Sequence, residues 1–180
     1  MREVRLSDYT IAADYVFDRI PEGRITVNTI NAYSWVMADK DPLFRKALIG
    51  SDYLLPDGIA VVWAARFLRG EKINKIAGAD LHKMVLETLN REGGKCFYLG
   101  ASERTLSLIR TRLAREYPNV RVETYSPPFK ATFSPEDNQE MIDRVNRFAP
   151  DALFVGMTAP KQEKWIEREC SYNLWHWRRV

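Results

Sequence analysis

Four segments of the chain concentrate polar residues and glycine, at positions 28–31, 56–58, 100–102 and 156–165. In the second, Asp57 stands between a proline and a glycine after an apolar run. A rigid turn there could project its carboxylate into a cleft as a general base. The commoner role of such an aspartate is structural, in a turn or as a helix cap that holds amides near Ala60.

The first and third segments have the chemistry to bind a sugar and a phosphate group. Thr29 and Asn31 are two residues apart in an expected strand, so their side chains share one side and could bind sugar hydroxyls or satisfy backbone groups. Gly100 would let a ligand approach the backbone, and the amides opening the next helix would suit a diphosphate. A strand-glycine-helix turn is as often a plain connection, and the dinucleotide fingerprint G-x-G-x-x-G is absent.

The fourth segment places cations at the start of an expected helix. Lys161 and Lys164, with Gln162 between them, fall in or near its first turn, where the positive end of the helix dipole disfavours lysine. This mismatch indicates an anionic ligand. A solvated lysine also tolerates such a position, so the structural explanation stays open.

Alternating helix and strand signals with short breaks predict the elements that position these segments. Strands are expected at 24–31, 53–55, 95–99, 120–125 and 152–155, and helices at 7–19, up to 50, 59–68, 80–91, 102–117, 135–148 and 160–165. The pattern predicts a single α/β domain with a Rossmann-like parallel sheet and flanking helices. Ligands of such sheets bind at the carboxyl ends of the strands, where the four segments lie.

Charge and composition narrow the class of partner. A formal charge of +3, without dense basic blocks, argues against nucleic acid as a partner. Four cations gather at Arg66, Arg69, Lys72 and Lys75, where they could meet phosphates or lipid head groups or simply form a solvated face. The amino terminus has no apolar signal core, and the longest apolar stretch, 59–65, is too short to span a bilayer, so any membrane contact is expected to be peripheral.

The cysteines and histidines indicate neither a disulfide framework nor a metal site. Cys96 and Cys170 stand at a spacing that fits no metal-ligand pattern with His82 and His176. This usage suits a reducing cytosol.

Five segments together resemble the WecG/TagA/CpsF family of glycosyltransferases over roughly residues 7–169. They are Thr-x-Asn-Ala at 29–32, Pro-Asp-Gly at 56–58, Ala-Gly-Ala-Asp at 77–80, Phe-Tyr-Leu-Gly-Ala at 97–101, and Phe-Val-Gly-Met-Thr-Ala-Pro-Lys-Gln-Glu-Lys-Trp at 154–165. The resemblance implies transfer, with inversion and no obligatory metal or other cofactor, of N-acetylmannosamine or a related sugar from a UDP-sugar. The acceptor would be undecaprenyl-diphosphate-linked N-acetylglucosamine at the inner face of the cytoplasmic membrane, in the synthesis of a bacterial surface polysaccharide.

The same resemblance implies roles for individual residues. Asp57 would be the general base, and Thr29 would position the reacting sugar. The implied substrate-binding residues are Asn31, Lys75, Asp80, Gly100, Ala101, Gly156, Lys161 and Gln162. Lys75 stands where the family often has arginine. Lysine keeps the positive charge of arginine but lacks its planar bidentate fork.

The last ten residues depart from the family pattern. The family core is expected at 1–170, followed by a non-family tail at 171–180 that a frameshift could explain, with the chain truncated relative to the family. Trp175 and Trp177 each have the single codon TGG, and reading one base later turns both into glycine codons, as in the Gly-rich strand that the family places here.

Three alternatives remain open from the sequence. The chain could be an active transferase, an inactive remnant that binds nucleotide or partner subunits, or a Rossmann-type dehydrogenase, which the missing dinucleotide fingerprint disfavours. A homo-oligomer is compatible with the sequence.

Overall fold

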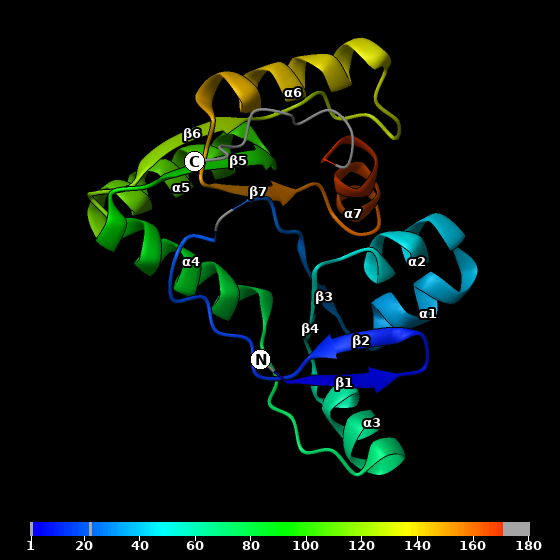
Figure 1. The fold of residues 1–180 in the computed structure, drawn as a ribbon. Helices are drawn as coiled ribbons and strands as arrows, with labels where there is room; N and C mark the ends of the chain where they lie inside the picture. The colour runs from blue at the N-terminus through cyan, green and yellow to red at the C-terminus, as the bar shows by residue number, and fades with distance from the viewer. Residues whose placement is uncertain (1, 22, 171–180) are drawn as a thin grey trace.

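The computed structural model describes residues 2–21 and 23–170 and has the predicted α/β architecture. Its strands form two sheets, one with the order β1-β2-β4-β3 and one with the order β6-β5-β7 (Figure 1). The predicted tail at 171–180 lies outside the described residues, so its origin stays a prediction.

The amino-terminal segment is a β-hairpin, so the helix predicted from Ser7 to Arg19 is wrong. Strands β1 (Glu3–Leu6) and β2 (Tyr9–Ala12) pair antiparallel, with Leu6 opposite Tyr9. Ser7 turns the chain with a φ of 53° instead of capping a helix. The physical reason is a period of two, because buried and exposed residues alternate along β1 and into β2.

The four-stranded sheet continues from β2 through parallel strands. Strand β4 (Tyr53–Pro56) lies between β2 and β3 (Val27–Ile30). The helical stretch predicted up to residue 50 is two helices, α1 (Ala32–Lys40) and α2 (Pro42–Ile49). The break falls at Asp41, whose carboxylate accepts a hydrogen bond from the Phe44 amide at 3.0 Å and caps α2.

The three-stranded sheet is wholly parallel and agrees closely with the predicted elements. Strand β5 (Lys95–Gly100) is central, between β6 (Arg121–Tyr125) and β7 (Ala152–Gly156). Helices α5 (Glu103–Glu116) and α6 (Pro135–Phe148) make the crossovers. A reciprocal capping box between Ser134 and Asp137 begins α6, with Pro135 in its first turn.

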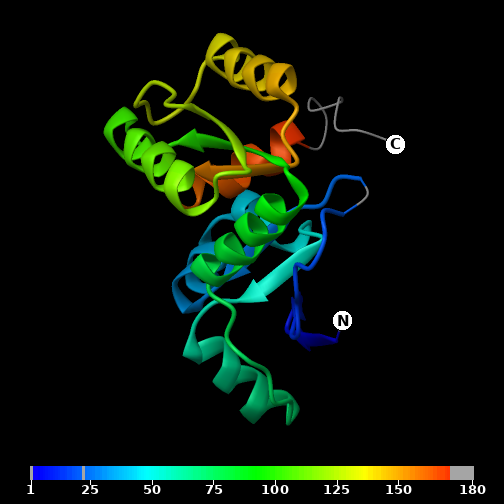
Figure 2. The same ribbon diagram turned by 90° about the vertical axis from the view of Figure 1, so that its left-hand side faces the viewer.

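Two helices connect the sheets, and a short one follows β7. Helix α3 (Ile59–Arg69) packs against β1 at the lower edge of Figure 1, whereas α4 (Gly78–Glu92) leads back toward the three-stranded sheet (Figures 1 and 2). Helix α7 (Lys161–Trp165) continues into a π-helical turn, Ile166–Cys170, and packs against α2, where Lys164 forms an ion pair with Asp41. No helix in the described ranges is both long and apolar enough to cross a membrane.

Candidate active site

Asp57 lies at the carboxyl end of β4 beside the end of β3. Its amide donates a hydrogen bond to the carbonyl oxygen of Ile30 at 2.9 Å, which holds the two strand ends together. Helix α3 begins after Gly58 without any side-chain cap, so the capping role open to Asp57 in the sequence is not adopted. The half-buried carboxylate makes no hydrogen bond or ion pair with another described residue. It is therefore available for contact with a ligand at this strand end.

Thr29 and Asn31 sit at the end of the neighbouring strand and have different surroundings. Asn31 caps α1, because its Oδ1 accepts a hydrogen bond from the Ser34 amide at 2.9 Å while its own amide donates to Ser34 Oγ at 2.9 Å. Thr29 instead lines a cavity, and its methyl group lies 4.0 Å from where a Cβ on Gly78 would be. Asn31 thus has a structural role, while Thr29 faces space that a ligand could occupy.

The segment between α3 and α4 returns to the end of β4. The Ile76 amide donates to the carbonyl oxygen of Pro56 at 2.9 Å, which brings the exposed Lys75 close to Asp57 along the backbone. Asp80 faces its own helix terminus, since its Oδ2 accepts a hydrogen bond from the Ala77 amide at 3.0 Å. Lys75 is the cation that this segment adds to the strand ends.

Gly100, Ala101 and Gly156 meet at the carboxyl ends of β5 and β7. Gly100 is opposite Gly156 in the ladder, and the Ala101 amide donates to the Gly156 carbonyl oxygen at 2.9 Å. Gly100 has a φ of 108°, and a Cβ there would lie 2.5 Å from that oxygen. Glycine is needed here for the close contact between the strands, whatever its role toward a ligand.

The side chains of Lys161 and Gln162 diverge. Lys161 Nζ donates to the carbonyl oxygen of Lys130 at 2.5 Å and lies 3.6 Å from the centre of the Phe133 ring, and burial lowers its pKa. Gln162 lines the same cavity as Thr29, and its Nε2 donates to Glu163 Oε1 at 2.9 Å. Only Gln162 of this pair faces the cavity.

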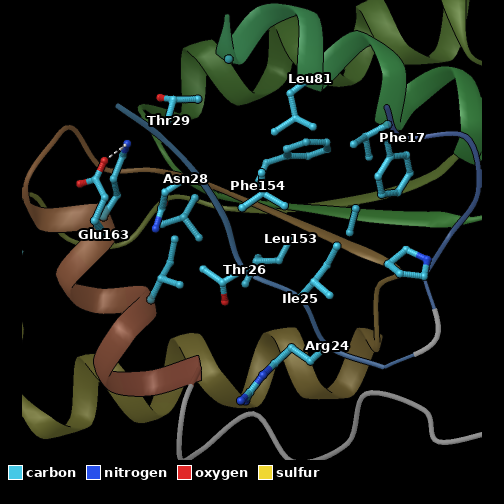
Figure 3. A pocket seen from close by; sticks show the side chains of 18 of the residues that line it. Phe17, Arg24, Ile25, Thr26, Asn28, Thr29, Leu81, Leu153, Phe154 and Glu163 are labelled. Carbon is cyan, nitrogen blue, oxygen red and sulfur yellow. Dashed lines mark hydrogen bonds between the residues drawn. The ribbon is translucent and has the colours of Figure 1, made fainter. Parts of the chain in front are cut away.

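The cavity has a volume of about 320 Å³ and lies between β3 and β7 (Figure 3). Among described strands, β3 pairs only with β4 and β7 only with β5, so each strand has an unpaired edge. Most of the lining is apolar, including Phe17, Leu81 and Phe154. Thr29 and Glu163 lie on the same side of the view in Figure 3, away from Phe17.

Of the predicted site residues, the structure brings Thr29 and Gln162 to this cavity, although they are far apart in sequence. The others lie outside its lining, at the strand ends or on the loops described above. They are Asn31, Asp57, Lys75, Asp80, Gly100, Ala101, Gly156 and Lys161.

Two buried polar residues of the cavity were not singled out from the sequence. Glu163 is 7% exposed, and its Oε2 has no hydrogen-bond partner among the described residues. Burial raises the pKa of its carboxyl group, against the opposing effect of the hydrogen bond from Gln162. Asn28 is buried too and donates to Ser51 Oγ at 2.9 Å. The sequence signal for Glu163 was its place beside Gln162, but its burial depends on how α7 packs.

Comparison of the sequence with known proteins identifies the family of this chain. A family model described as the glycosyl transferase WecG/TagA/CpsF family matches residues 3–174. The chain belongs to this family. The resemblance noted in the sequence is thereby confirmed.

Three bacterial members of the family illustrate the similarity. All three are named N-acetylglucosaminyldiphosphoundecaprenol N-acetyl-beta-D-mannosaminyltransferase. The protein from Bacillus subtilis strain 168 is 29% identical over 89% of this chain, that from Bacillus spizizenii 28% over 73%, and that from Staphylococcus aureus strain NCTC 8325 29% over 64%. These alignments span 61%, 49% and 44% of the respective relatives, so the chain covers less than two thirds of their length.

Proposed function

We propose that this WecG/TagA/CpsF-family chain carries the catalytic core of an inverting glycosyltransferase. It transfers N-acetylmannosamine or a related hexose derivative from a UDP-sugar to undecaprenyl-diphosphate-linked N-acetylglucosamine, in the synthesis of a cell-surface polysaccharide. Family membership and the names of the relatives support the reaction class. The observation that carries the proposal to this chain is the carboxylate of Asp57, which has no partner among the described residues and lies beside the strand end that bears Thr29.

In the proposed reaction, Asp57 takes the proton from the attacking hydroxyl of the acceptor sugar. The hydroxyl oxygen bonds to the anomeric carbon of the donor, and the bond from that carbon to the UDP oxygen breaks on the opposite face. Inversion follows from this single displacement. A carboxylate without a partner in the described part of the chain suits the step, because no hydrogen bond seen there has to be broken before it accepts the proton.

The remaining residues bind the donor and stabilise the leaving group. Thr29 and Gln162 hold the sugar where the cavity reaches the strand ends, because both line it. Leaving UDP carries negative charge, which Lys75 and the backbone amides at the strand ends stabilise. The acceptor carries a polyprenyl chain, so the protein works as a peripheral protein at the inner face of the cytoplasmic membrane.

The test is transfer from UDP-N-acetylmannosamine to a synthetic lipid-diphosphate N-acetylglucosamine acceptor by the chain and by Asp57→Asn. Loss of the base should lower turnover by about two to four orders of magnitude. Affinity for UDP, measured by isothermal titration, should stay within about twofold of the unsubstituted chain, because Asp57 contacts the acceptor hydroxyl.

Asp39→Asn is the matched control, since Asp39 is an exposed aspartate on α1. It should transfer at the unsubstituted rate. Equal turnover in Asp57→Asn would remove Asp57 from the mechanism. UDP binding without any transfer by the unsubstituted chain would favour the inactive remnant instead.

A further inference from the structure

Helix α3 exposes a row of large apolar side chains that a water-facing helix would not be expected to carry. Ile59, Trp63 and Phe67 follow one another at intervals of four residues, so they lie on one face of the helix. They are 56%, 58% and 81% exposed, whereas Val61 and Ala65 on the opposite side are buried in the core. We call this row the α3 stripe.

Cations border the α3 stripe. Arg66 and Arg69 are exposed on the last turns of α3, and Lys72 is exposed just beyond. None of the three side chains forms an ion pair within the described ranges. The acid nearest to them in sequence, Glu71, is already paired with Arg2 at 2.7 Å. The border therefore keeps its positive charge.

An apolar stripe with tryptophan and phenylalanine, bordered by arginine and lysine, has the composition of a helix that lies in a membrane interface. The aromatic side chains enter the boundary between head groups and acyl chains, and the cations meet anionic head groups. A second protein chain would have to match the same apolar row with carboxylates along its border.

The position of α3 connects this surface to the candidate active site. Ile59, the first residue of the stripe, follows Asp57 by two residues, at the end of the helix that joins the body. The rest of α3 lies at the lower edge of the molecule in Figures 1 and 2, with Val61 and Ala65 packed in the core and the stripe on the opposite face. A bilayer against the stripe would thus lie next to the end of β4.

We infer that the α3 stripe and its cationic border dock on the surface of an anionic lipid bilayer, and so bring a lipid-linked acceptor to Asp57. The link to Asp57 rests on the proposed function, whereas the bilayer contact stands independently of it.

The contact is tested by flotation of the purified chain with vesicles of phosphatidylcholine and phosphatidylglycerol, and with vesicles of phosphatidylcholine alone. Trp63→Ser combined with Phe67→Ser should reduce the vesicle-bound to free ratio about tenfold or more. Arg66→Glu combined with Arg69→Glu should reduce the bound to free ratio to a similar extent with the anionic vesicles, but not with vesicles of phosphatidylcholine alone. Binding should also weaken as salt rises.

The matched control carries the same kinds of change on α5, where Leu108 is 65% exposed and Arg104 is exposed. Arg104→Glu combined with Leu108→Ser should float like the unsubstituted chain, and circular dichroism should show every variant folded. The inference is overturned if the unsubstituted chain does not float with anionic vesicles, if the stripe variant floats equally well, or if the control loses as much.

Two further measurements separate the alternatives. The Trp63→Ser, Phe67→Ser variant should transfer sugar to a short, water-soluble acceptor at the unsubstituted rate, and about tenfold more slowly to an acceptor embedded in vesicles. Transfer to neither acceptor by the unsubstituted chain would refute the proposed function and leave the flotation result to decide the docking. Lipid-free self-association that the stripe substitutions abolish would identify a protein interface and overturn the bilayer contact.

Discussion

The fold buries the carboxyl group of Glu163 without providing hydrogen bonds to both of its oxygens. Its Oε1 accepts a hydrogen bond from Gln162, while Oε2 has no partner among the described residues. Burial raises its pKa above the usual value of about 4.5. Folding thus favours the protonated carboxyl group. The contribution of Glu163 to the free energy of unfolding is complete below pH 4.5 and is lost as the pH rises through the raised pKa.

Glu163→Gln should remove this pH-dependent loss. We expect the variant to be more stable than the unsubstituted chain at pH 7 by about 1 kcal/mol, because a buried charge is replaced by a neutral amide. The difference should shrink toward pH 4.5. Urea unfolding at several pH values measures it, with the exposed Glu123→Gln as control. A difference that does not change with pH would show that the carboxyl group stays in one protonation state.

The sequence indicated where several candidate site residues stand in the fold, whereas their roles toward a ligand stay predictions. Asp57 follows a strand as predicted, and its carboxylate has no partner in the described ranges, although capping is the commoner role. For Asn31 the structural alternative is the one seen, since a serine three residues later completes a capping box. Lys161 contacts the loop at Lys130, a partner distant in sequence that no local pattern could reveal.

At the scale of elements, Gly100 shows why the β5-β7 junction tolerates so little change. An alanine there would meet both an unfavourable φ and the carbonyl oxygen of Gly156. Gly93, at the end of α4, has a φ of 71°, but a Cβ added there would meet nothing within 4 Å. A substitution at Gly93 therefore tests the unfavourable φ alone, whereas one at Gly100 tests the φ together with a steric clash.

We predict that Gly93→Ala lowers the free energy of unfolding by about 1 kcal/mol through its φ alone. Gly100→Ala should lower it by about 3 kcal/mol or more, because the strands must also move apart. Urea denaturation of both variants gives the comparison. Equal losses would mean that the junction adjusts to a methyl group without strain.

Elements with strong local signals were predicted well, and the one major error arose where a local helix signal competed with pairing between strands. Helix α6 begins at its capping serine and proline, as expected from these residues. In the amino-terminal segment, Ser7 resembles a helix cap and Ile11 and Tyr15 fit a helical spacing, yet the period-two burial of β1 and β2 prevails. Pairing between strands supplies the hydrogen bonds that decide this, and it is not a local property.

At the scale of the whole molecule, the sequence indicated the α/β class but not how the strands are distributed. Strands β4, β5 and β7 could be recognised by their apolar runs, whereas β2 was missed. The division into sheets depends on pairing between distant segments. Strands β3 and β7 illustrate this, because both border the cavity and neither pairs across it. From the sequence, a site between two sheets could be predicted only as separate polar segments that follow strands, without their arrangement in space.

The unpaired edge of β3 can be identified amide by amide. In a parallel ladder, successive residues direct their backbone groups to opposite neighbours. The Tyr53 amide donates to the carbonyl oxygen of Thr26 and the Asp57 amide to that of Ile30. Counting in steps of two, Asn28 and Ile30 direct their amides to β4, so Val27 and Thr29 direct theirs toward the cavity.

Hydrogen–deuterium exchange should therefore alternate along β3. The amides of Asn28 and Ile30 should exchange slowly, whereas those of Val27 and Thr29 should exchange at least about tenfold faster, since no described strand pairs with them. Residue-resolved NMR measures this, with the doubly flanked β4 as the uniformly slow reference; equal rates along β3 would contradict it. The open strand edge thus makes the Thr29 amide a built-in reporter, whose exchange slows when a ligand occupies that end of the cavity.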